Sequence, residues 1–149
     1  MSKIFNLGLH KTGTESIHHL MKDLSISSLH EPTFNIFNHT AADLKKELTL
    51  YDCYSGGIAS KYKEVYESYP DAKYLLTIRN PNSWLQSSRN HYSDLDGSEY
   101  VKSIFGVNKP FELSDEEMIN IFNNFNKKII DLESEYRGKS LLDDPTDLE

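Results

Sequence analysis

The stretch from residue 3 to residue 17 constrains the fold of this sequence more than any other. An alternating apolar segment begins at Ile4, a helical pattern begins near Ile17, and Gly8 and Gly13 lie between them. The first amides of a helix have no intrahelical partner and lie at the positive end of the helix dipole. This strand, loop and helix therefore predict a receptor for phosphate or sulfate.

The residues of this loop are suited to an anion. Gly13 and Thr14 are small enough for an anion to approach the backbone, and Lys11 adds a mobile positive charge. The hydroxyls of Thr12, Thr14 and Ser16 are further hydrogen-bond donors. We expect the loop to hold an oxyanion.

The loop differs from the nucleotide-triphosphate loop, G-x-x-x-x-G-K-[ST]. Gly8 and Gly13 have the separation of that motif, but Thr14 and Glu15 occupy the positions of its lysine and hydroxyl residue. The lysine, Lys11, comes before the second glycine instead.

A second basic residue follows an apolar run in the middle of the chain. Residues 72–78 form a near-continuous apolar segment, which is typical of a strand in a parallel sheet, and Arg79 comes directly after it. Open α/β sheets bind ligands outside the carboxyl ends of their strands. We therefore expect Arg79 and Lys11 to converge on one edge of the sheet.

Strand and helix patterns alternate along the rest of the chain, which predicts an α/β fold with a mostly parallel sheet flanked by helices. We expect one domain over residues 1–149. The expected strands cover residues 25–32 (alternatively a loop), 48–54, 72–78 and a short segment at 140–142. The expected helices cover residues 15–23 and 58–69, begin after Thr40, Ser83 and Ser114, and include a short one at 101–105, with the long last helix ending at 137–139.

Composition excludes several classes of protein. The net charge of -7 argues against broad attraction to nucleic acid or anionic lipid. No apolar run approaches the roughly 20 residues of a membrane span, and no signal sequence is recognisable, so we expect a cytoplasmic protein. Cys53 is the single cysteine, which rules out an intrachain disulfide, and the spacing of the six histidines predicts no metal site.

The two anion-binding segments together resemble the sulfotransferases that use 3′-phosphoadenosine 5′-phosphosulfate (PAPS). Lys-Thr-Gly-Thr at residues 11–14 resembles their 5′-phosphosulfate loop, and Arg79, Pro81 and Ser87 match the spacing of their 3′-phosphate site. The resemblance implies a three-layer sandwich like that of P-loop NTPases, with no metal requirement. The implied cofactor-binding residues are His10, Lys11, Thr12, Gly13, Thr14, Glu15, Ser16, Arg79 and Ser87.

The resemblance also implies a reaction, the in-line transfer of a sulfuryl group to a hydroxyl or amine. Lys11 would stabilise the leaving phosphate oxygen, and a general base would take the proton of the acceptor. The candidates for this base are His30, Glu31 and Asp52. The acceptor, whether a small molecule, a sugar or a peptide, is left open by the sequence.

Three departures from the family pattern keep alternatives open. One is that no basic, glycine-rich C-terminal loop is recognisable, since residues 137–139 match it poorly. Glu15 occupies the position of a second threonine, and Ser16 that of an adenine-stacking tryptophan, so Trp84 or another aromatic residue would have to stack on the base. One alternative is a nucleotide- or anion-binding module of the same fold without catalytic activity. The other is a kinase-like phosphotransferase, in which Asp52 would bind Mg²⁺.

Overall fold

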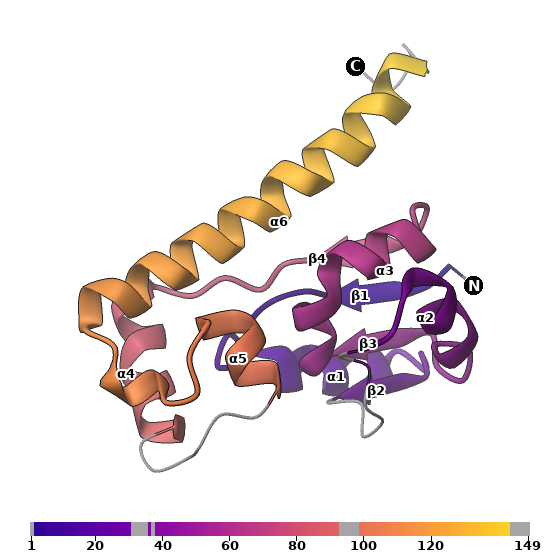
Figure 1. Cartoon of the computed structure of the whole chain (residues 1–149). Coiled ribbons are helices and arrows are strands. Elements are labelled where there is room, and N and C mark those ends of the chain that lie inside the picture. Colours follow the sequence, from indigo (N-terminus) through magenta and orange to yellow (C-terminus); the bar gives the residue numbers. More distant parts are fainter. Residues whose placement is uncertain (1, 31–35, 37, 93–98, 144–149) are drawn as a thin grey trace.

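The computed structural model describes residues 2–30, 36, 38–92 and 99–143. Short strands alternate with helices along this part of the chain (Figure 1). The strands are β1 (Ile4–Asn6), β2 (Ser28–His30), β3 (Cys53–Ser55) and β4 (Lys73–Leu75). The α-helices are α1 (Thr14–Asp23), α2 (Ala41–Glu47), α3 (Tyr62–Ser68), α4 (Pro81–Tyr92), α5 (Glu99–Phe105) and α6 (Asp115–Asp143), and the 3-10 helices are η1 (Gly57–Lys61) and η2 (Pro110–Glu112).

The strands form a four-stranded sheet in the order β2-β3-β1-β4, and every pair is parallel. This confirms the predicted α/β fold. Parallel strands need crossover connections, which the helices supply. The register pairs Phe5 of β1 with Tyr54 and Tyr74 on its two neighbours, so three aromatic rings stack across the sheet at centroid distances of 5.9 and 5.6 Å.

Three strands are shorter than the sequence predicts, and one of them, β2, begins at Ser28 rather than residue 25. The ladder of β4 ends at Leu75 rather than residue 78, because β1, its neighbour, ends at Asn6 and the chain then runs towards the turn that begins at His10. Likewise β3 begins at Cys53 rather than residue 48, because residues 48–51 follow the end of α2 and pair with no strand. For β3 and β4 the neighbouring strand, not the apolar run, decides the length of the ladder.

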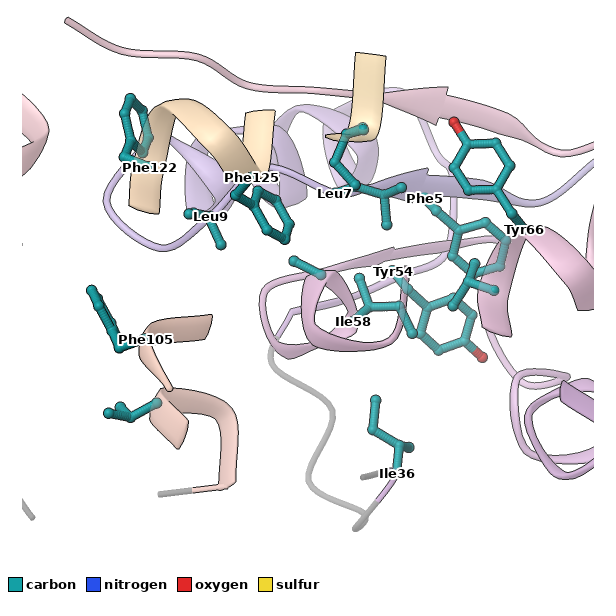
Figure 2. Close-up of a cluster of buried hydrophobic side chains, with 14 of the residues drawn as sticks. Phe5, Leu7, Leu9, Ile36, Tyr54, Ile58, Tyr66, Phe105, Phe122 and Phe125 are labelled. Carbon is teal, nitrogen blue, oxygen red and sulfur yellow. The ribbon is translucent and has the colours of Figure 1, made fainter. Parts of the chain in front are cut away.

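The core lies between the sheet and the helices. Figure 2 shows side chains from β1, β3, η1, α5 and α6 meeting in it, among them Phe5, Tyr54, Ile58 and Phe122. Trp84 of α4 is fully buried, and its ring stacks on that of Phe122 at 4.4 Å. Burial of such large apolar side chains is the main source of stability in a domain of this kind.

Two helix boundaries differ from the predictions. Asn80, not Ser83, caps α4, because its Oδ1 accepts hydrogen bonds from the amides of Asn82 and Ser83 while Pro81 supplies the first helical residue. Helix α6 continues through residues 137–143, so the predicted strand at 140–142 is wrong. A lone glycine, Gly138, lowers helix stability by about 1 kcal/mol but does not end a helix. None of the helices in the described ranges is both long and apolar enough to cross a membrane.

Candidate functional site

The loop between β1 and α1 has the backbone that an anion receptor requires. Lys11 and Gly13 both have positive φ, 61° and 95°, and Gly13 directly precedes the helix. A left-handed conformation at a lysine costs about 1–2 kcal/mol. The first intrahelical bond runs from the amide of Ile17 to the carbonyl of Gly13, so the amides of Thr14, Glu15 and Ser16 come before it and are the donors available to an anion.

This loop borders a hollow of about 250 Å³ at the carboxyl edge of the sheet. Its lining combines the loop with residues from two other parts of the chain. The lining residues are His10, Lys11, Gly13, Thr14, Glu15, Ser16, His30 and His91. The loop, the end of β2 and the end of α4 thus meet at one place.

Arg79 lies at the same edge and touches the loop. Its Nη1 donates a hydrogen bond to the carbonyl oxygen of Lys11 at 3.2 Å, although 68 residues separate the two in sequence. Both side chains are exposed. Arg79 itself is not among the residues that line the hollow.

The two serines near the middle of α4 have different surroundings. Ser87, which matches the family spacing, is half-buried, whereas Ser88 is fully buried and its hydroxyl lies 3.0 Å from His10 Nε2. Ser88 therefore holds the loop in place, and Ser87 is the serine with some exposed surface.

His10 is the residue through which α4 and α5 hold the loop. Its Nδ1 lies 3.1 Å from the hydroxyl of Tyr100, and its carbonyl oxygen accepts a hydrogen bond from the Trp84 indole at 3.0 Å. Burial lowers the pKa of His10 to about 3, with smaller effects from the charges of His91 and Lys11. His10 is therefore neutral at physiological pH and adds no charge to the site.

Two loop side chains point away from the position of an anion. The Thr12 hydroxyl is turned inward, where it donates to the carbonyl of Leu9 at 2.6 Å and contacts Thr77 Oγ1 at 2.7 Å. Glu15 points outward: its side chain is 76% exposed and pairs with His19 at 3.7 Å. The carboxylate thus lies in solvent at the first turn of α1, where its negative charge interacts favourably with the positive end of the helix dipole.

His30 is the sequence-predicted base candidate that borders the hollow. The register of β2 and β3 places it beside Ser55, whose Oγ lies 2.9 Å from His30 Nδ1. The rings of His18 and His30 are 5.8 Å apart, and burial lowers the pKa of His18, with a further effect from the charge of His30. Glu31, the other candidate beside it, lies outside the described residues.

Two expectations about this site are wrong. Asp52 precedes β3 and accepts a hydrogen bond from Ser27 Oγ at 3.1 Å, so it lies at the amino edge of the sheet, opposite His30. Trp84 has no exposed surface with which to stack on an adenine. The error for Asp52 arose because the start of β3 was predicted too early, and the error for Trp84 arose because its burial in the core was not foreseen.

Three residues that border or support the site were missed by sequence reasoning. His91 lines the hollow, Tyr100 holds His10, and Thr77 contacts Thr12. One signal could have found His91, because it follows Ser87 by one helical turn. No comparable pattern marks Tyr100 or Thr77.

Comparison with known proteins gives two findings. A family model described as "Sulfotransferase domain" matches residues 32–144, a region that contains Arg79 and Ser87 and begins after the Lys11 loop. "Ava biosynthesis cluster protein M" of Aspergillus versicolor is 29% identical over 109 residues, which make up 59% of this chain and 42% of that protein. The chain thus spans less than half the length of this relative.

Proposed function

This chain belongs to the sulfotransferase domain family, and on that basis we propose that it transfers a sulfuryl group from PAPS to a hydroxyl or amine acceptor. One observation carries the proposal: the guanidinium of Arg79 reaches the carbonyl of Lys11, two residues before the N-cap of α1. Two cationic groups beside a helix N-terminus are suited to a ligand with two separate phosphate groups.

The chemistry of the residues fits such a nucleotide. The amides of Thr14 and Ser16, together with the Lys11 ammonium, would hold the 5′-phosphate, while Arg79 and Ser87 would hold the 3′-phosphate. The hollow of about 250 Å³ is smaller than the roughly 300–1,000 Å³ of typical ligand pockets. It therefore suits one end of the nucleotide rather than the whole molecule.

When bound, PAPS supplies an activated sulfuryl group, whose sulfur–oxygen bond to the 5′-phosphate breaks as the acceptor oxygen or nitrogen bonds to sulfur. Lys11 would stabilise the negative charge on the departing phosphate oxygen. His30, whose Nδ1 lies 2.9 Å from Ser55 Oγ, would take the acceptor proton. Catalysis then depends on positioned donors more than on a covalent intermediate.

Binding of adenosine 3′,5′-bisphosphate, measured by calorimetry, tests the nucleotide half of this proposal. A charged hydrogen bond to phosphate is worth about 1.5–3 kcal/mol, so Lys11→Ala and Arg79→Ala should each weaken binding about tenfold or more. Lys45→Ala is the matched control, because Lys45 is exposed and borders a hollow with Lys3 and Ala72 at the opposite edge of the sheet. Absence of binding to the unsubstituted protein at millimolar nucleotide would contradict the proposal.

Transfer of labelled sulfate from PAPS to a panel of sugars, phenols and tyrosine peptides tests the catalytic half. His30→Gln should keep nucleotide affinity and lose turnover. A second candidate function is a nucleotide-binding module without transfer, favoured by the carboxylate of Glu15 at a position that borders the hollow. Nucleotide binding without transfer to any acceptor class would support this second function over the first.

A further inference from the structure

We infer that Thr77 is a positioning residue, whose hydroxyl fixes the spacing between the two anion-binding groups of the site. This inference rests on the proposed function, because it concerns a ligand that touches both Lys11 and Arg79. Thr77 itself would touch neither the nucleotide nor the acceptor. It would act by tying the loop after β1 to the segment after β4.

The contacts of Thr77 join these two segments directly. Thr77 lies two residues before Arg79, and its Oγ1 is 2.7 Å from Oγ1 of Thr12, the residue after Lys11. It also lies 3.3 Å from Asn6 Oδ1, at the end of β1. A single hydroxyl is thus within hydrogen-bond distance of side chains at both ends of the loop.

The available protons set the direction of these contacts. Thr12 donates its hydroxyl proton to the carbonyl of Leu9 at 2.6 Å, so it accepts from Thr77. Thr77 has one proton, which it shares between Thr12 Oγ1 at 2.7 Å and Asn6 Oδ1 at 3.3 Å. The loop that carries Lys11 is held by the contact with Thr12 to the segment that carries Arg79.

Gly8 and Asn6 are fitted to the same arrangement. A Cβ atom at Gly8 would lie 1.9 Å from Thr77 Oγ1 and 2.9 Å from the Thr77 carbonyl oxygen, so only glycine permits this approach. Asn6 is fully buried, and its Oδ1 accepts from the Gly8 amide at 2.9 Å. Among the described residues its Nδ2 has no hydrogen-bond partner, and burying this unsatisfied donor lowers the stability of the folded state.

Thr77→Val is a clean test because it removes only the Thr77 hydroxyl and leaves the bond from Arg79 to the Lys11 carbonyl in place. Valine has nearly the shape of threonine without the hydroxyl. Thr12 would keep its bond to Leu9, and Asn6 would keep its bond to Gly8. Neither partner would be left without a hydrogen bond.

The experiment compares the binding of two nucleotides, one with two phosphate groups that can contact the site and one with a single phosphate group. Adenosine 3′,5′-bisphosphate can engage both groups, whereas adenosine 5′-monophosphate engages the loop alone. In the unsubstituted protein the second anchor should raise affinity about tenfold or more, through effective concentration. In Thr77→Val we expect this preference to fall about threefold or more, with the affinity for the monophosphate unchanged within about twofold.

Three further variants make the result specific. Thr77→Ser keeps the hydroxyl and should keep the preference, whereas Thr77→Ala lacks it and replaces Thr77→Val should that variant fail to fold. Thr49→Val makes the same substitution at an exposed site, where the hydroxyl contacts the carbonyl of Lys46, and should change neither affinity.

The possible results separate this inference from the proposed function. A Thr77→Val protein with equal losses for both ligands, or with an unchanged preference, would overturn the positioning role and leave the proposed function intact. An unsubstituted protein that binds the bisphosphate no better than the monophosphate would overturn both. A selective loss of the preference that Thr77→Ser restores is the result we expect.

Discussion

Acidification should destabilise this protein through His10 in particular. The imidazole lies between α4 and α5, with Ser88 at one ring nitrogen and Tyr100 at the other, and burial lowers its pKa from 6.5 to about 3. In the unfolded chain the same side chain binds a proton below about pH 6.5. The unfolded state therefore gains protons as the pH falls from 6.5 towards 3, and the folded state does not.

The sign and the size of the effect follow from this difference in proton binding. Stability is complete above pH 6.5 and is lost as the pH falls towards 3, at about 1.36 kcal/mol per pH unit. Between pH 7 and pH 5 the loss due to His10 is therefore about 2 kcal/mol. The lowered pKa of His18 adds to the acid sensitivity in the same direction, but it is common to the protein with and without His10.

Urea unfolding of the protein and of His10→Gln, at pH 7 and at pH 5, measures this quantity. Trp84, the single tryptophan, donates to the His10 carbonyl and is a direct fluorescent reporter. We expect the free energy of unfolding to fall about 2 kcal/mol more in the unsubstituted protein than in the variant. Asn90→Gln, an exposed substitution on α4, should follow the unsubstituted protein at both pH values.

Parallel pH profiles for the protein and His10→Gln would refute this reasoning. Should the variant fail to fold, NMR titration of the unsubstituted protein gives the same answer. A His10 imidazole that titrates between pH 5 and pH 7 would show that its environment does not exclude the charged form.

Three further substitutions test separate parts of the structure. Gly8→Ala places a Cβ atom 1.9 Å from Thr77 Oγ1, so it should lower the free energy of unfolding by about 1–3 kcal/mol and abolish nucleotide binding, both measurable on the purified variant. Glu15→Gln removes an exposed negative charge beside the hollow and should strengthen bisphosphate binding about twofold at low salt, an effect that fades in a high-salt titration. Thr40→Ala removes the capping box with Asp43 at the start of α2 and should lower the free energy of unfolding by about 1 kcal/mol in urea; an unchanged value would show that the cap is not needed.

The convergence of Lys11 and Arg79 on one sheet edge was predictable because it depends on topology alone. Each follows a segment with strand character, and parallel strands present their carboxyl ends together. His30, at the end of β2, lines the same hollow as Lys11. Residues whose position follows from strand direction can therefore be located without knowing any contact.

The surroundings of these groups were not predictable, because they depend on contacts between distant segments. The inward turn of the Thr12 hydroxyl requires Thr77, 65 residues away, and the neutral state of His10 requires Tyr100 and Ser88. The predicted ends of the strands were wrong for a related reason, because a strand pairs only as far as its neighbour extends. The predicted third strand began too early, so Asp52, which precedes β3, was expected at the wrong edge of the sheet.

A structure of the protein bound to adenosine 3′,5′-bisphosphate tests the central claim most directly. We expect the 5′-phosphate within hydrogen-bond distance of the Thr14 and Ser16 amides and of the Lys11 ammonium, and the 3′-phosphate on the Arg79 guanidinium. A nucleotide bound elsewhere, or one whose 3′-phosphate makes no contact with Arg79, would contradict the account.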